Sequence, residues 1–325
     1  MNDPFNKNAK AVYGKAVRIA PQLRRITANN PSPMTFTGTQ TYLVGDKNVV
    51  VIDPGPADPA HTQTILDALL PGERIVGILV THTHVDHSPG TAALIKATGA
   101  PSFAFGEHGT GMSENMAALS ASGATMGGGE GADRTFKPTM AVKDGDNIKF
   151  PGLSFGVIHT PGHLSNHICF DAGEGVVFTG DLVMGWATTM VSPPDGDMAA
   201  FLASLNRMKA REDRVYYPGH GEPVRNIQEN LEYQLSHRKL RDAQIRQVLK
   251  DGPATPAEIT AKVYANIDKS LHAAAARNVF AHLLGMLSDE KATVEGPISP
   301  ESRFAVTEKG IRGDRKMTVK PRSTT

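Results

Sequence analysis

Cysteine is almost missing from this chain, since Cys169 is the only one among 325 residues. No internal disulfide can form and a cysteine-based zinc knuckle is excluded, so a bound metal would need histidine and carboxylate ligands. Cys169 lies between Ile168 and Phe170. Apolar neighbours of this kind predict a buried strand position for Cys169.

Long apolar runs are also missing. Residues 1–25 lack the apolar core of a signal peptide, and no uninterrupted apolar stretch could span a bilayer. We therefore expect a cytoplasmic protein with no membrane partner. With 40% apolar and 21% charged residues, the chain can bury a full core and has room for two domains.

A strong net charge is lacking as well, because the formal value is only +1. Basic residues nevertheless gather at the C-terminal end, where residues 309–325 hold six lysines and arginines against Asp314. We interpret residues 309–325 as a flexible basic tail rather than a nucleic-acid-binding arm.

What the sequence does have is a dense group of metal-capable side chains in residues 81–87, directly after a short apolar, β-branched run that predicts a strand. In extended backbone His82 and His84 point to the same side, and Asp86 and His87 follow where the chain turns. One histidine at a strand end is usually a hydrogen-bonded polar residue. Four such groups together would all need partners, and their two directions predict two adjacent metal ions.

Three later stretches repeat the pattern of a short apolar strand that runs into a metal-capable residue. Glycine directly precedes each of these residues, with proline before the glycine in two of the three stretches. Glycine permits the sharp turns that direct a side chain from a strand end into a shared cleft. The residues are His163, Asp181 and His220.

Together these motifs resemble the metallo-beta-lactamase superfamily over about residues 35–225. The resemblance implies an α/β fold, a four-layered αβ/βα sandwich with the ligands at one edge of two facing sheets. It also implies that Asp181 bridges two ions. The remaining ligands it implies are His82, His84 and His163 for one ion, and Asp86, His87 and His220 for the other.

Such a site predicts a dinuclear metal-dependent hydrolase. Two divalent ions lower the pKa of a water between them, and the resulting bridging hydroxide can attack a carbonyl carbon or phosphorus. Asp86 is the candidate catalytic residue that orients this nucleophile and accepts a proton. Zinc is the expected metal because the ligands are rich in histidine, although iron or manganese would also fit. Esters, thioesters, lactones and phosphodiesters are the candidate substrates.

Two alternatives remain open. Within the superfamily that the chain resembles, persulfide dioxygenases use one iron in a similar frame, whereas flavodiiron proteins carry a glutamate in the first motif. Val85-Asp86-His87 speaks against the flavodiiron type and leaves a mononuclear iron oxidoreductase open. The second alternative is a nucleic-acid-binding protein in which the metal has only a structural role.

Beyond residue 225 the pattern becomes helical. Helices are predicted over 227–250, 255–264 and 271–288, the second opening with the capping box Thr255-Pro256-Ala257-Glu258, and a small hairpin follows at 293–295 and 303–307. This order indicates a winged-helix module. The expected divisions are 1–35 (N-terminal extension and first strand region), 36–225 (metallo-beta-lactamase domain), 226–308 (winged-helix-like domain) and 309–325 (tail).

The added module makes the chain similar to the lactamase-beta-like group, which includes endoribonucleases that act on single-stranded RNA. This resemblance implies RNA as an alternative to a small-molecule substrate. Without the tail, however, residues 233–308 hold ten basic and nine acidic residues, which is a weak charge for a nucleic-acid-binding face. A module that packs beside the site or mediates homodimer contacts is the simpler interpretation.

Four further features have two interpretations each. Asp53, after a strand, is either a turn former or the partner of a ligand imidazole. His167 is expected to be a hydrogen-bonded partner of the site rather than a substrate contact. Trp186 could form part of the wall of the substrate site or pack in the core. The glycine-rich residues 106–140 predict a mobile flap near the site, with disorder as the alternative.

Overall fold

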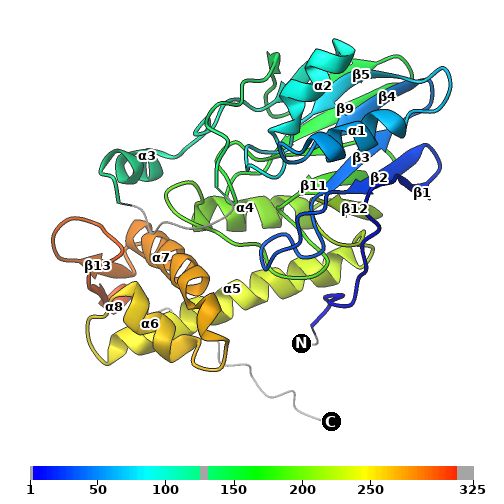
Figure 1. Cartoon of the computed structure of the whole chain (residues 1–325). Coiled ribbons are helices and arrows are strands. Elements are labelled where there is room, and N and C mark those ends of the chain that lie inside the picture. The colour runs from blue at the N-terminus through cyan, green and yellow to red at the C-terminus, as the bar shows by residue number, and fades with distance from the viewer. Residues whose placement is uncertain (1–2, 125–130, 313–325) are drawn as a thin grey trace, which may run out of the picture.

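The computed structural model describes residues 3–124 and 131–312. Two β-sheets face each other in it (Figure 1). The seven-stranded sheet has its strands in chain order: β1 Val17–Ala20, β2 Leu23–Thr27, β3 Gln40–Val44, β4 Asn48–Ile52, β5 Arg74–Leu79, β6 Ser102–Ala104 and β7 Met140–Ala141. The five-stranded sheet has the order β12-β11-β10-β9-β8: β8 Asn147–Phe150, β9 Leu153–His159, β10 Ile168–Asp171, β11 Val176–Gly180 and β12 Val215–Pro218.

The alternation of side chains along β4 shows how the layers form. Val50 and Ile52 pack into the core between the two sheets, where they join Phe155 of β9. Val49 and Val51 point the other way, into a second core under the helices on the outer face. Because successive strand residues face opposite sides, one apolar run covers both faces of a buried strand.

Helices cover the outer faces of both sheets (Figure 1). α1 Pro59–Asp67 and α2 Gly90–Thr98 lie on the seven-stranded sheet through Ile65 and Leu94. α4 Met198–Lys209 and the first half of α5 Ile227–Lys250 pack on the five-stranded sheet. The predicted four-layered αβ/βα sandwich is therefore confirmed. Cys169 is fully buried in β10, as predicted.

The C-terminal module forms a core of its own. It contains the second half of α5 and the following elements: α6 Pro256–Val263, the 3-10 helix Lys269–Leu271, α7 His272–Ser288, β13 Ala292–Val294, β14 Phe304–Val306 and α8 Glu308–Arg312. The capping box is present, with Thr255 and Glu258 bonding reciprocally at the start of α6. The predicted helices and hairpin are confirmed. Of the expected tail, residues 313–325 lie outside the described residues.

The glycine-rich insertion differs from the expected flap over the part that the structure describes. It contains a helix, α3 Glu114–Ala121, whose Met116 and Leu119 are buried in the core of the C-terminal module. The two side chains are three residues apart and so share one helix face. Residues 125–130, which include the triple glycine, lie outside the described residues.

The helices of the structure can be compared with the expected absence of a membrane-spanning segment. In residues 3–124 and 131–312, no helix is long and apolar enough to cross a bilayer.

Candidate metal centre

The stretch of residues 81–87 leaves the seven-stranded sheet directly after β5. Its first residue is held on both sides, because the Thr81 N–H donates to Asp53 Oδ1 (2.8 Å) and its carbonyl accepts from the Ile168 N–H (2.9 Å). The second of these bonds joins the edges of the two sheets. Residues after β9, β11 and β12 reach the same edge, so all seven predicted residues come together.

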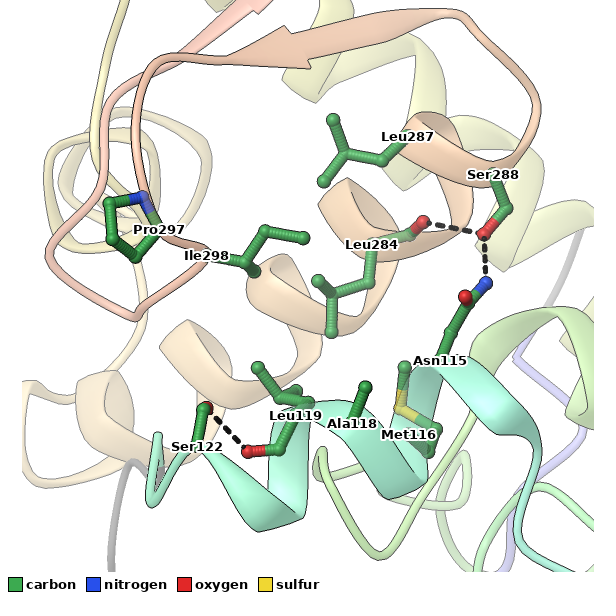
Figure 2. Close-up of a pocket in the computed structure, with 10 residues that line it drawn as sticks. All are labelled: Asn115, Met116, Ala118, Leu119, Ser122, Leu284, Leu287, Ser288, Pro297 and Ile298. Atoms are coloured by element: carbon green, nitrogen blue, oxygen red, sulfur yellow. Dashed lines mark hydrogen bonds between the residues drawn. The ribbon is translucent and has the colours of Figure 1, made fainter.

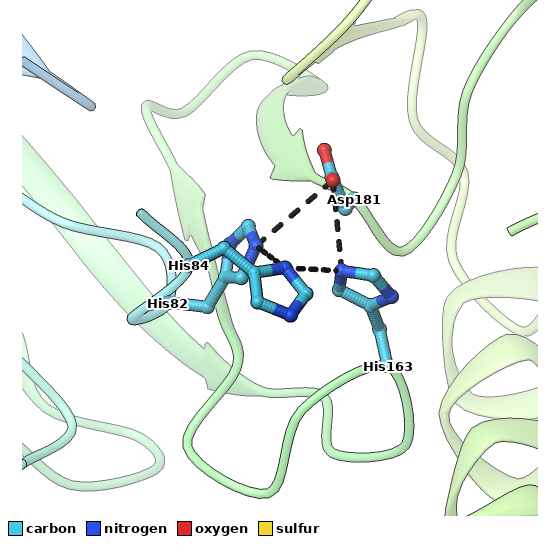
Figure 3. Close-up of side chains that lie close together, drawn as sticks. All are labelled: His82, His84, His163 and Asp181. Atoms are coloured by element: carbon cyan, nitrogen blue, oxygen red, sulfur yellow. Dashed lines mark hydrogen bonds and ion pairs between the residues drawn. The ribbon is translucent and has the colours of Figure 1, made fainter. Parts of the chain in front are cut away.

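Two groups of side chains could each hold a cation. The first consists of His82, His84, His163 and Asp181, and the second of Asp86, His87 and His220; within each group the candidate ligand atoms lie within 4.8 Å of one another. All seven residues are buried except His84, which is half-buried. Figure 3 shows the first group, with three imidazoles converging on the carboxylate.

Asp181 stands between the two groups. Its Oδ2 lies 3.6 Å from His163 Nε2 and 3.9 Å from His82 Nε2 in the first group, and also 3.2 Å from His220 Nε2 and 3.6 Å from His87 Nε2 in the second. One carboxylate oxygen therefore faces four imidazoles from both groups. This is the position that a bridging ligand would occupy.

Four of the five imidazoles are oriented by a bond on the side away from the cluster. The pairs are His82 Nδ1 with Thr81 Oγ1 (2.9 Å), His87 Nδ1 with Asp53 Oδ2 (2.9 Å), His163 Nδ1 with the Met190 carbonyl (2.8 Å) and His220 Nδ1 with the Gly38 carbonyl (3.3 Å). Bonds of this kind place the proton on Nδ1 and leave the Nε2 lone pair toward the cluster. In His84 it is Nδ1 that faces inward, 3.0 Å from both His82 Nε2 and His163 Nε2.

Asp53 has both of the functions between which the sequence could not decide. Its positive φ of 50° places it in a turn after β4. Its Oδ2 accepts bonds from His87 Nδ1 and from the Thr81 hydroxyl at 2.7 Å. The Thr81 oxygen is therefore available to accept from His82, and one buried carboxylate orients an imidazole in each group.

The buried carboxylates show that a cation fits here. Asp86 Oδ1 and Asp181 Oδ1 are buried and have no hydrogen-bond partner within the described residues. Burying a charged oxygen without a partner is unfavourable, and several imidazole lone pairs facing one another are unfavourable for the same reason. Divalent cations would satisfy both, and the nitrogen-rich donor set suits a borderline metal such as zinc.

Glycine is required where the backbone closes around this cluster. A Cβ atom on Gly219 would lie 2.2 Å from Asp181 Oδ1 and 2.6 Å from His87 Cε1. Gly180, whose φ is +46°, would place a Cβ 2.7 Å from both His167 Nε2 and Thr81 Oγ1. Both glycines therefore leave room for the side chains that meet at the sheet edge.

The charges of the two groups differ. Burial lowers the pKa of His82 well below its ordinary value, and nearby His87 and His84 lower it further. Burial also acts on His87, but the carboxylates of Asp86, Asp181 and Asp53 outweigh it and raise the pKa of His87 well above the ordinary value. The negative charge is therefore denser around His87 of the second group than around His82 of the first.

His167 is hydrogen-bonded, as expected. Its Nδ1 lies 2.9 Å from Thr160 Oγ1, and its Nε2 accepts from the Asp181 N–H at 3.1 Å. Burial lowers the pKa of His167 to about 3, so the ring is neutral and can accept this bond. His167 thus positions the backbone of Asp181.

Thr39 is a site residue that the sequence did not reveal. Its hydroxyl donates to Asp86 Oδ2 at 2.7 Å. Thr39 is fully buried, and its backbone pairs with that of His220 in an isolated antiparallel β-bridge, so it contacts two members of the second group. No local pattern marks it, because its partner in the site, Asp86, lies 47 residues away in the chain. Trp186, which the sequence could place at the substrate or in the core, is half-buried and stacks on Phe36, with the ring centroids 4.8 Å apart.

Comparisons with known proteins agree with this geometry. A family model described as the metallo-beta-lactamase superfamily matches residues 34–220, and one described as a beta-lactamase associated winged helix domain matches residues 255–297. A beta-lactamase-like protein 2 homolog from Drosophila melanogaster is 28% identical over 87% of this chain and 94% of its own length.

A second relative bears a name that states an activity. An atrochrysone carboxyl ACP thioesterase from Cryptosporiopsis sp. is 28% identical over 72% of this chain, which spans 64% of that relative's length. Among solved structures, a beta-lactamase domain protein from Burkholderia ambifaria superposes with a TM-score of 0.75 at 22% identity, covering 92% of this chain and 96% of its own. The structural likeness extends through both the sandwich and the C-terminal module.

Proposed function

The chain belongs to the metallo-beta-lactamase superfamily, and on that premise we propose that it is a dinuclear metal-dependent hydrolase of ester or thioester bonds. One observation carries the proposal: Asp181 Oδ2 lies within 3.2–3.9 Å of imidazoles from both candidate metal groups. Asp86, His87 and His220 lie together as a second complete group of ligands. A second group favours two ions over the single iron of a persulfide dioxygenase.

The proposed ligands are those of the two groups, with Asp181 shared between them. Zinc is the proposed metal because five of the seven ligands are imidazoles. When bound, two such ions would supply Lewis acidity and a hydroxide nucleophile near neutral pH. The outer bonds from Asp53, Met190 and Gly38 would keep the imidazoles in place before the metal arrives.

Asp86 is the proposed catalytic residue. Thr39 holds Asp86 Oδ2 by a hydrogen bond, whereas Oδ1 has no partner within the described residues. Oδ2 is also the oxygen that faces His87 Nε2 (3.3 Å) and His220 Nε2 (3.4 Å), so Oδ2 would hold the ion, and Oδ1 would orient a water bound to that ion and accept its proton. Burial disfavours the charged form of Asp86, but the neighbouring His87 and His220 outweigh it and hold its pKa well below the ordinary value, so the carboxylate is ionised near neutrality.

An ester or thioester is the proposed substrate because the name of the Cryptosporiopsis relative states a thioesterase. RNA is not favoured, since residues 233–308 of the module have nearly balanced charge. We propose the domain division at about residue 225, so that the sandwich carries the chemistry and the module at 226–308 contributes a wall beside it.

The test combines metal analysis with turnover. Protein purified with zinc in the medium should contain two zinc ions per chain and hydrolyse acyl-coenzyme A thioesters. A chelator should remove both the metal and the turnover, and added zinc should restore them. One iron per chain together with oxygen consumption would support the dioxygenase alternative and overturn the proposal.

A further inference from the structure

A large cavity lies between the insertion helix α3 and helix α7 of the C-terminal module (Figure 2). None of the seven proposed metal ligands lines it. Its volume is about 510 Å³, within the range of small-molecule sites. Figure 2 shows Leu119, Leu284, Leu287 and Ile298 pointing into it from both sides. Its walls therefore come from two parts of the chain more than 150 residues apart.

The chemistry of the lining narrows the choice of ligand. Among the described residues that line the cavity, none is charged and none is aromatic. Phosphates and carboxylates would find no charged partner there, and a base or aromatic ring would find no ring to stack on. Flexible side chains of Met, Leu and Ile, with a few serine and asparagine groups, are suited to an aliphatic chain.

The insertion helix is held firmly enough to form a wall. The Ser113 hydroxyl, which caps α3, donates to Asp197 Oδ2 at 3.0 Å. Asp197 in turn caps α4 of the sandwich. Asn115 Nδ2 donates to Ser288 Oγ of α7 at 3.3 Å, as Figure 2 shows, so α3 is attached to both domains.

Two smaller cavities connect the large one, through shared lining residues, with the loop that carries His163. The next, of about 240 Å³, shares Asn115 and Met116 with it and reaches Asp197. The last, of about 50 Å³, shares Met116 and Asp197 and reaches Gly162 and Ser165. Gly162 and Ser165 belong to the loop that carries His163, one of the proposed ligands.

We propose that the large cavity between α3 and α7 binds the distal, aliphatic part of the substrate's acyl chain. The two smaller cavities, which Asp197 also lines, mark the course of the chain toward the loop that carries His163. The inference rests on the proposed function, because it places the scissile carbonyl at the metal centre. Each methylene that becomes buried should raise kcat/KM by roughly fourfold, up to the length that fills the cavity. Acetyl substrates are too short to benefit.

Two neighbouring alanines of α3 provide a matched test. Ala118 and Ala117 are both exposed, but Ala118 lines the cavity and Ala117 lines none of the cavities described above. Ala118→Trp fills the space without replacing a core residue. With zinc-loaded full-length protein, Ala118→Trp should lower kcat/KM for decanoyl-coenzyme A by tenfold or more and leave acetyl-coenzyme A unchanged, whereas Ala117→Trp should behave as wild type.

A binding measurement separates this inference from the proposed hydrolysis. Decanoate titrated by calorimetry should bind wild type and Ala117→Trp equally and Ala118→Trp at least tenfold more weakly. If decanoate binds in this pattern but no thioester is hydrolysed, the proposed function fails and the cavity assignment stands.

Two results would overturn the acyl-chain site while leaving the hydrolase intact. One is turnover of thioesters with no dependence on chain length. The other is Ala118→Trp having the same effect on acetyl and decanoyl substrates. Ile298→Glu, which introduces a charge at an exposed edge of the cavity, should reproduce the selective loss for long chains without relying on added bulk.

Discussion

The residues of the candidate metal centre and the core of the C-terminal module are both buried, but different interactions stabilise their arrangement. At the sheet edge, buried histidines and carboxylates are positioned by specific hydrogen bonds, and Asp181 and Asp86 each keep an oxygen without a partner in the described chain. In the module, Phe280, Leu283 and Phe304 are fully buried among apolar neighbours. In the first region, buried charged oxygens without a partner among the described residues lower the stability, and a cation would relieve this cost. In the second region, apolar packing contributes stability directly.

The largest effect should come from removing the shared carboxylate. Asp181→Ala deletes the oxygen that faces four imidazoles, so metal content and turnover should both be lost, with kcat/KM falling by more than about 100-fold. Metal analysis and thioester hydrolysis would measure this. Asp67→Ala, which removes an exposed carboxylate of α1, is the control and should change neither. Full metal content in Asp181→Ala would contradict the bridging role.

Phe280→Ala tests the opposite region. Phe280 is completely buried and packs edge-on against Phe304, with ring centroids 6.2 Å apart. The substitution should lower the free energy of unfolding by about 3–5 kcal/mol, measured by urea denaturation. Metal content per folded chain should stay at the wild-type value. Loss of metal from folded Phe280→Ala protein would show that the two regions are not energetically separate.

Asp53→Asn weakens the support of the metal centre without removing a ligand. The amide cannot accept as strongly from both His87 and Thr81, so two imidazoles lose their orientation. Zinc affinity, measured by chelator competition, should fall by about 10- to 100-fold. Unaltered affinity would mean that the protein fold orients these imidazoles without Asp53.

The smallest expected effect is on the pH dependence of stability, through the buried His282 of the C-terminal module. Burial, together with Arg238, His237 and Arg241, lowers the pKa of His282 to about 3. The unfolded chain has an ordinary histidine pKa near 6.5 and therefore binds the proton more readily. Stability is complete above pH 6.5 and decreases as the pH falls toward 3, by about 2 kcal/mol at pH 5.

His282→Gln isolates this contribution, since glutamine does not titrate. Urea denaturation at pH 7 and pH 5 should show a smaller loss of stability in His282→Gln than in wild type. An identical loss in both proteins would assign the acid sensitivity to other groups.

Local patterns accounted for most of the secondary structure. The apolar run of β4, the run before His82 and the capping box at Thr255 each depend on residues close together in the chain, and such signals do not require knowledge of the fold. The insertion was harder to interpret. Met116 and Leu119 lie on one face of α3, but their packing partner α7 lies about 150 residues further along.

The sequence by itself marked the seven residues proposed for the metal centre, because apolar strand runs and the glycines at their ends are local signals. The layered architecture followed from the resemblance of these motifs to the metallo-beta-lactamase superfamily. Only the tertiary structure decided which oxygens orient the imidazoles, that Thr39 holds Asp86, and that α3 and α7 enclose a cavity. These features depend on distances between segments far apart in the chain. Such distances are set when the sheets and helices pack, and no short stretch of sequence encodes them.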